Sequence, residues 1–198
     1  MGVYKQFSIL FLDIRGFTLF FDQVYTSDPE QTARLLKDTW EILTEIINKH
    51  SGRIDKIMGD GVMVLFKNSL DAFDTAWTMM FKIAKIDEHL NLPTPAEPNG
   101  WLGIPFQAGI GIEEGMVGVE AAYIQGKKHQ LVIGIPVIIA ARLAAEAKPM
   151  RILVGEEAYK KIRKKWNEEI FVEREFVAKH GKKIKYWEVD MTSQVYED

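Results

Sequence analysis

The chain contains no cysteine among its 198 residues. This absence excludes disulfide bonds, metal sites built from thiolates and a cysteine nucleophile. The chain also lacks any run of the 18 or more apolar residues that a membrane helix needs, and its first residues lack the apolar segment of a signal peptide. We therefore expect a cytoplasmic protein that has no membrane partner.

An excess of one charge is missing as well. Lys and Arg total 25, Asp and Glu total 28, and the formal net charge is −3. This balance argues against a protein that acts mainly by neutralising the phosphates of a nucleic acid. The basic stretches Lys160–Lys165 and Lys182–Lys185 are interpreted as solvated faces of a helix and a hairpin. We expect no nucleic-acid partner.

The composition is that of a folded protein. Hydrophobic residues make up 47% of the chain and aromatic residues 11%, which is enough apolar surface for one core. At about 150 residues per domain, the length predicts a single domain over residues 1–198.

The order of predicted elements indicates an α+β domain. The apolar run Phe7–Ile14 predicts a buried strand, and Asp28, Pro29 and Glu30 mark the start of an amphipathic helix that ends near His50. Further strands are expected at Arg53–Met58, Val62–Phe66, Phe106–Ile112, Met116–Val119, Leu131–Ile133, Arg151–Val154, Ile170–Val177 and Lys183–Val189. Further helices are expected directly after Gly16 and at Ser69–His89, Val137–Ala147 and Glu156–Trp166, with a loop through residues 93–100. This order predicts a mixed sheet with helices packed on it.

Asp13 ends the first predicted strand, just before the helix expected at Gly16, Phe17 and Thr18. A glycine before a helix leaves free backbone N–H groups that suit a phosphate. A carboxylate beside a phosphate would repel it unless both held a cation such as Mg²⁺. The alternative is that Asp13 only caps the helix.

Asp60 lies between Gly59 and Gly61, at the tip of the hairpin expected over residues 53–66. Gly-Asp-Gly is common turn chemistry, and taken alone it favours a structural role. A functional role gains weight only when Asp60 is considered together with Asp13.

Four motifs occur in a fixed order along the chain. They are F-L-D-I-R-G-F-T (Phe11–Thr18), G-R-I-D-K-I-M-G-D-G-V-M-V-L-F (Gly52–Phe66), A-G-I-G-I-E-E-G-M-V-G (Ala108–Gly118), and A-A-R-L-A-A-E-A-K-P with I-L-V-G-E-E-A-Y (within Ala140–Tyr159). Together they resemble the catalytic domains of class III nucleotide cyclases, the adenylate and guanylate cyclase family. The resemblance implies a ferredoxin-like βαββαβ core with extra elements and a head-to-tail homodimer that shares two active sites between its chains.

The resemblance implies a two-metal reaction on a nucleoside triphosphate. Asp13, Ile14 and Asp60 would form the metal site and hold two Mg²⁺ or Mn²⁺ ions. The backbone of Gly16, Phe17 and Thr18 would receive the triphosphate. The product would be a 3′,5′-cyclic nucleotide, with pyrophosphate as the leaving group.

The remaining site residues implied by the resemblance are basic. Lys56 matches the position that contacts the base, and Arg142 the position that stabilises the transition state, both from the second chain. Lys179 or His180 would contact the γ-phosphate.

Two positions depart from the family pattern. Ile138 stands where an asparagine normally contacts the ribose, and the loss of one such donor typically costs about 10² to 10³ in rate. Leu131 stands where adenylate cyclases carry an Asp or Thr that accepts a hydrogen bond from the adenine amino group. ATP remains slightly favoured; the alternatives are a pyrimidine cyclase of phage defence that uses UTP or CTP, GTP as substrate, and a silent module that binds nucleotide or dimerises.

Overall fold

The computed structural model describes residues 3–15, 29–85, 107–178 and 181–196. Within them the strands form one sheet in the order β2-β3-β1-β4-β6-β8-β7, and β5 pairs with β4. The strands are β1 (Val3–Arg15), β2 (Arg53–Met58), β3 (Gly61–Phe66), β4 (Gln107–Ile124), β5 (Lys127–Ile133), β6 (Arg151–Gly155), β7 (Val172–Val177) and β8 (Lys183–Asp190). The helices are α2 (Pro29–Lys49), α3 (Ser69–Ala84), α5 (Ile135–Glu146), α6 (Glu156–Ile162) and α7 (Thr192–Tyr196), with a 3₁₀ turn at Glu168–Ile170.

The first half of the described chain forms the expected ferredoxin-like core. Its elements follow the order β1, α2, β2, β3, α3, β4, and its strands lie in the order β2-β3-β1-β4. All strand pairs are antiparallel except β4 with β6. The predicted α+β class, with a mostly antiparallel sheet flanked by helices, is therefore confirmed.

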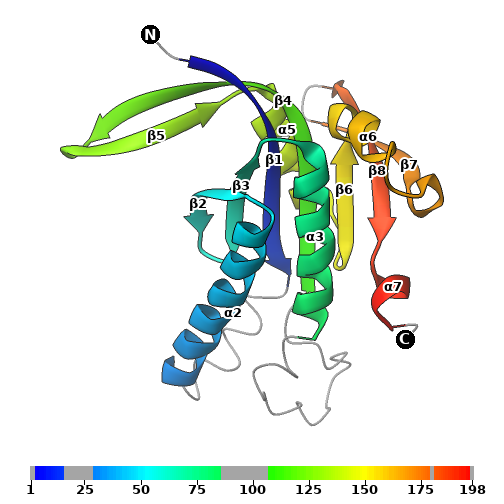
Figure 1. Ribbon diagram of the computed structural model, residues 1–198, viewed down its shortest axis with the longest axis horizontal. Helices are drawn as coiled ribbons and strands as arrows, with labels where there is room; N and C mark the ends of the chain where they lie inside the picture. Colours follow the sequence, from blue (N-terminus) through cyan, green and yellow to red (C-terminus); the bar gives the residue numbers. More distant parts are fainter. Residues whose placement is uncertain (1–2, 16–28, 86–106, 179–180, 197–198) are drawn as a thin grey trace.

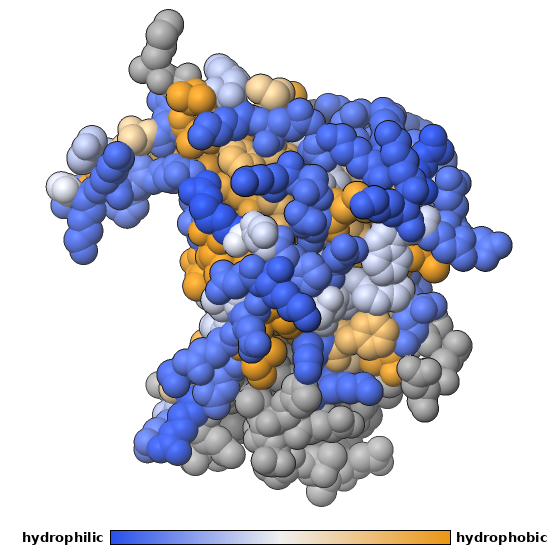
Figure 2. All heavy atoms as spheres, viewed as in Figure 1, coloured by the Kyte–Doolittle hydropathy of each residue, from blue (hydrophilic) through white to orange (hydrophobic). Residues whose placement is uncertain are grey.

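The sheet is covered on both faces, which explains the continuous apolar run of β1. Leu10, Leu12 and Ile14 point into the main core with α2, α3 and α6, while Ile9 and Phe11 point to the opposite face, where α5 lies (Figure 1). Of these side chains, Ile9, Leu10, Leu12 and Ile14 are buried, and full burial of such a side chain contributes roughly 1.5 to 3 kcal/mol. Figure 2 shows that the outward sides of α2, α3 and α6 are mainly hydrophilic.

The prediction of two short strands separated at Glu113, Glu114 and Gly115 was wrong. β4 runs without interruption from Gln107 to Ile124 and pairs with β1 from Val3↔Val119 to Arg15↔Gln107. Two adjacent acids resembled a turn, yet both side chains are buried and bonded, so the ladder continues through them.

A hairpin arm formed by β5 and the distal part of β4 was only partly predicted. The predicted strand Leu131–Ile133 is the end of β5, which begins at Lys127. Gln125 and Gly126 form the turn with φ of 51° and 78°, the pair of positive values that a type I′ hairpin turn requires. The arm extends from the body of the sheet (Figure 1).

The other predicted elements agree at their centres and differ at their ends. α3 ends at Ala84 and α6 at Ile162, earlier than predicted, and β1 is longer at both ends. The helix expected after Gly16, the loop through residues 93–100 and the predicted end of the helix at His89 lie outside the described residues. Among the described helices, none is long and apolar enough to cross a bilayer.

Candidate active site at the end of the sheet

The fold brings Asp13 and Asp60 together at one end of the sheet. In the register of β1 with β3, Asp13 lies opposite Gly61, the residue after Asp60. The Ile14 N–H donates to the Asp60 carbonyl oxygen at 3.3 Å, which ties the turn to β1. Gly59 supports the turn with φ +68°, a value that favours glycine at the first central position. Residues 47 positions apart in sequence are thus neighbours.

The environment of Asp13 raises the pKa of its carboxyl group above the ordinary value. Burial raises the pKa of Asp13, the Arg15 guanidinium lowers it and the negative charge of Asp60 raises it again. The influence of Asp60 agrees with the close approach of the two side chains. The side chain is 41% exposed and therefore open to a ligand.

Arg15 contacts Asp13 directly and was not singled out from the sequence. Its Nη1 donates to Asp13 Oδ2 at 2.6 Å. Its Nη2 donates to the carbonyl oxygens of Ala144 and Ala145, the latter at 3.3 Å, near the end of α5. The two-residue spacing on β1 puts both side chains on one face, and this was the signal available in the sequence.

The two carboxylates suit a hard divalent cation. A Cβ built on Gly61 would lie 3.7 Å from Asp13 Oδ1, so this oxygen faces the turn that carries Asp60. Among the described residues no group of three or more His, Cys, Asp or Glu could hold a metal ion. One or two carboxylates, completed by substrate phosphates and water, are the usual protein ligands of Mg²⁺. Ile14 is buried, so it would contribute only through its main chain.

Lys56 lies on β2 after an irregularity in the strand. The register with β3 shifts between Ile54 and Lys56, which leaves Asp55 as an extra residue, a β-bulge. The bulge places Lys56 opposite Met63, on the face of the sheet that α5 covers. Lys56 is exposed and has no hydrogen-bond or ion-pair partner within the described ranges.

Asp55 itself is a feature that sequence reasoning missed. Its side chain is only 3% exposed, and its Oδ2 has no hydrogen-bond partner. The nearest cation is Arg53, whose Nη2 lies 3.9 Å from Oδ1 and whose Nη1 donates to Gln130 on β5 at 3.0 Å. The strand of Lys56 is thereby tied to the arm that carries Leu131.

The other predicted site residues lie on the arm and on α5. Leu131 is half-buried on β5, opposite Glu120 of β4. Ile138 is 53% exposed on α5. Arg142, one turn further along α5, is half-buried and forms no hydrogen bond or ion pair with another described residue. Within the described part of one chain, Lys56 and Arg142 form no hydrogen bond or ion pair with Asp13 or Asp60. Gly16, Phe17, Thr18, Lys179 and His180 lie outside the described residues.

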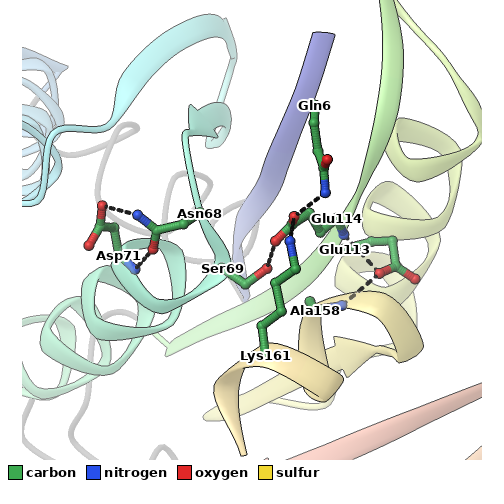
Figure 3. A network of polar contacts seen from close by, with 8 residues as sticks. All are labelled: Gln6, Asn68, Ser69, Asp71, Glu113, Glu114, Ala158 and Lys161. Carbon is green, nitrogen blue, oxygen red and sulfur yellow. Dashed lines mark hydrogen bonds and ion pairs between the residues drawn. The ribbon is translucent and has the colours of Figure 1, made fainter. Parts of the chain in front are cut away.

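A second acidic pair, Glu113 and Glu114, lies in the middle of β4 and, unlike the first pair, is almost completely buried. Glu114 accepts hydrogen bonds from Gln6 at 2.7 Å and from Ser69, and it pairs with Lys161 (Figure 3). Glu113 accepts from the N–H groups of Glu114 and Ala158, at 2.8 and 3.2 Å. Burial raises the pKa of Glu113 to about 7. This pair joins β1, β4, α3 and α6 inside the protein.

Comparison with known proteins identifies the domain type. A family model described as the adenylate and guanylate cyclase catalytic domain matches residues 1–189. An adenylate cyclase of Anabaena cylindrica is 29% identical over 163 residues, which cover 80% of this chain and 31% of that protein. The chain spans between about a quarter and a third, 26% to 31%, of the length of the curated relatives it matches.

Solved structures share the fold over nearly the whole chain. The crystal structure of the guanylyl cyclase Cya2 matches with a TM-score of 0.79 at 23% identity, covering 95% of this chain and 93% of that one. The adenylyl cyclase CyaB of P. aeruginosa matches with a TM-score of 0.78 at 22% identity, covering 96% and 95%. At this identity the likeness concerns the fold.

Proposed function

Because the chain belongs to the family of adenylate and guanylate cyclase catalytic domains, we propose that it converts a nucleoside triphosphate into the 3′,5′-cyclic monophosphate and pyrophosphate. The observation that carries the proposal is the convergence of Asp13 and Asp60 at the end of β1, with Asp13 Oδ1 facing the turn. A buried core has no need of two neighbouring acids at a strand end, whereas a cation that binds phosphates does.

In the proposed reaction the ribose O3′ forms a bond to the α-phosphorus while the bond from that phosphorus to pyrophosphate breaks. Two Mg²⁺ or Mn²⁺ ions, when bound, would lower the pKa of the 3′-hydroxyl and neutralise the phosphates. Asp13 and Asp60 would hold these ions, and the backbone of Gly16, Phe17 and Thr18 would receive the triphosphate. Lys179 would contact the γ-phosphate. The proton of the 3′-hydroxyl leaves to water or to a phosphate oxygen.

A complete site would require a homodimer. Lys56 and Arg142 have no ionic partner in the described part of their own chain, and we propose that each acts in the site of the other copy. Arg142 would donate two hydrogen bonds to the α-phosphate, where negative charge develops. Strands β1, β2 and β4, the arm and the start of α5 also expose large apolar side chains, which suits burial against a second copy. These side chains are Val3, Tyr4, Ile57, Met58, Met116, Tyr123, Ile124, Ile133, Ile135 and Ile138.

The base is read by Lys56 and Leu131 in this proposal, and the pair favours two substrates. Lys56 can donate to adenine N1 or to a pyrimidine carbonyl, but Leu131 cannot accept from an amino group. ATP is the first candidate. UTP is the second candidate, because its O4 accepts a hydrogen bond and so needs only a donor such as Lys56. If UTP is the substrate, we propose a role in antiviral defence. The likeness in fold does not choose between bases, since one neighbour is named a guanylyl and another an adenylyl cyclase.

The test is to incubate the purified protein separately with ATP, GTP, CTP and UTP in the presence of Mn²⁺ and to separate the products by chromatography. We expect one cyclic nucleotide to predominate. Exclusive cyclic AMP would reject the pyrimidine alternative, and cyclic UMP or CMP would reject ATP. If no cyclic product forms from any of the four, the silent-module alternative replaces the proposal.

Ile138 provides a gain-of-function test of the same proposal. Ile138→Asn would restore an amide at the position that contacts the ribose, and its exposure of 53% means that no core packing is lost. We expect kcat to rise about tenfold or more, because one oriented donor is typically worth 10² to 10³. Ile135→Asn, 63% exposed on the same helix, is the matched control and should not raise kcat. Equal rates for both variants would exclude a ribose contact at residue 138.

A further inference from the structure

Arg15 is, among the described residues, the cation placed directly on the candidate metal site. Its Nη1 lies 2.6 Å from Asp13 Oδ2, so this oxygen is already occupied. Asp13 Oδ1 faces the Asp60 turn and is the oxygen left for a metal ion. One oxygen of the Asp13 carboxylate is therefore bonded to Arg15, and the other is available to a metal ion.

The Arg15 guanidinium is fixed at both ends. Besides Asp13, it donates to the carbonyl oxygens of Ala144 and Ala145 at the end of α5. It also lies across Gly109 of β4, where an added Cβ would approach Nη2 to 2.8 Å and Nε to 2.9 Å. The side chain is 24% exposed, and Nε is buried without a hydrogen-bond partner. These contacts hold the guanidinium beside Asp13.

We propose that Arg15 is a positioning residue that makes the binding of a divalent cation at Asp13 and Asp60 depend on the triphosphate of the substrate. This inference rests on the proposed function of the two acids. With Arg15, the three ionised side chains carry a net charge of −1, and without it the two acids carry −2. A fixed positive charge within roughly 6 Å of a divalent cation weakens binding by more than tenfold at an effective dielectric constant of about 20.

The triphosphate would reverse this penalty. It brings about four negative charges into the site, so the repulsion from Arg15 is offset only when nucleotide and cation arrive together. At the same time, the bond from Arg15 to Oδ2 leaves Oδ1 facing the turn, as the oxygen that would hold a metal ion. Free Mg²⁺ would therefore not fill the site in the absence of substrate.

The test measures binding and does not depend on turnover. Metal-free protein is titrated with Mn²⁺, and free Mn²⁺ is followed by electron paramagnetic resonance, without nucleotide and with 3′-deoxy-ATP or 3′-deoxy-UTP, which lack the attacking hydroxyl. For Arg15→Gln we expect Mn²⁺ to bind at least about tenfold more tightly without nucleotide than in the unmodified protein. Arg15→Lys keeps the charge and should stay within about threefold. Arg174→Gln, the same charge change on exposed β7, should have no effect.

The outcomes separate this inference from the proposed function. If Arg15→Gln binds Mn²⁺ as weakly as the unmodified protein, while Asp13→Asn with Asp60→Asn abolishes nucleotide-dependent binding, Arg15 has only a structural role. If the unmodified protein binds Mn²⁺ equally well with and without nucleotide, the inference is also overturned, and this holds even if Arg15→Gln does not fold. If the double Asn variant binds Mn²⁺ and nucleotide like the unmodified protein, the proposed function itself is wrong.

Discussion

Glu113 and Glu114 lie in the middle of β4, whereas Asp13 and Asp60 lie at the end of the same sheet, where β1 meets the β2–β3 turn. The glutamates are 4% and 3% exposed, and their carboxylates accept hydrogen bonds from three elements. Asp13 is 41% exposed on its side chain and, among the residues that the structure describes, forms an ion pair with Arg15. A buried acid must be bonded by the protein, while an acid with an open oxygen is available to a ligand. We therefore assign the first pair to the fold and propose that the second takes part in the reaction.

The largest expected effect separates the two pairs by activity. Asp13→Asn combined with Asp60→Asn should lower the rate of cyclic nucleotide formation by at least about 10³, because the carboxylates proposed to hold both cations are lost. The free energy of unfolding should change by no more than about 1 kcal/mol, since the amides are isosteric and the site is half-exposed. Product chromatography and a urea titration measure the two effects.

Asp190→Asn is the matched control for this variant. Asp190 also ends a strand and pairs with an arginine, Arg151, at 2.5 Å, but it lies on β8, three strands away from β1 in the sheet. Its loss should leave the rate of cyclisation unchanged. An equal loss of activity in both variants would mean that broken ion pairs, and not missing metal ligands, cause the defect.

The buried pair should instead respond in stability. Lys161→Met removes the cation that compensates Glu114, whose carboxylate remains 3% exposed. Breaking one partner of a buried pair costs about 3 to 5 kcal/mol, and we expect about 2 to 3 kcal/mol here because Lys161 is itself 46% exposed and partly solvated. A urea titration at pH 7.5 measures the change in the free energy of unfolding.

Two further variants sharpen this result. Lys161→Met combined with Glu114→Met should be more stable than Lys161→Met alone, because no uncompensated charge is then left in the core. Lys160→Met removes an exposed lysine paired with Glu156 and Glu157 on the same helix and should cause no measurable loss. A loss from Lys160→Met as large as that from Lys161→Met would show that helix α6, and not the buried pair, is being weakened.

Much of this contrast was accessible from local sequence patterns. The strand–turn–strand pattern around Gly59 and Gly61 predicted the position of Asp60, and the apolar run predicted the centre of β1, which continues two residues past Asp13. These features depend on alternation and turn chemistry, which act within a few residues. The motifs then indicated the family, and its fold could be expected from them.

What the sequence did not reveal depends on contacts between distant residues. Glu113 and Glu114 resembled a turn because adjacent acids are rare inside a sheet; their partners Ser69 and Lys161 lie 45 and 47 residues away. The bulge at Asp55 likewise exists only relative to β3. Arg15 was visible as a charge on β1, but its anchor at the end of α5 is 129 residues away. Local patterns contain no information on such distances.

A further expected effect on stability concerns the ionisation of Glu113, and it tests whether this acid is a structural group. Burial raises its pKa from 4.5 to about 7, so the folded protein holds a proton that the unfolded chain releases between these values. The stability that Glu113 contributes is therefore full below pH 4.5 and is lost as the pH rises through about 7.

Glu113→Gln keeps an oxygen that accepts from the Ala158 N–H and cannot ionise, so it should remove this dependence of stability on pH. The quantity to compare is the unfolding free energy of Glu113→Gln minus that of the unmodified protein. Between pH 4.5 and pH 8 this difference should shift in favour of the variant by up to about 3 kcal/mol. Urea titrations at several pH values measure it. A constant difference would mean that Glu113 keeps its ordinary pKa and that the buried pair, like Asp13 and Asp60, is accessible to water.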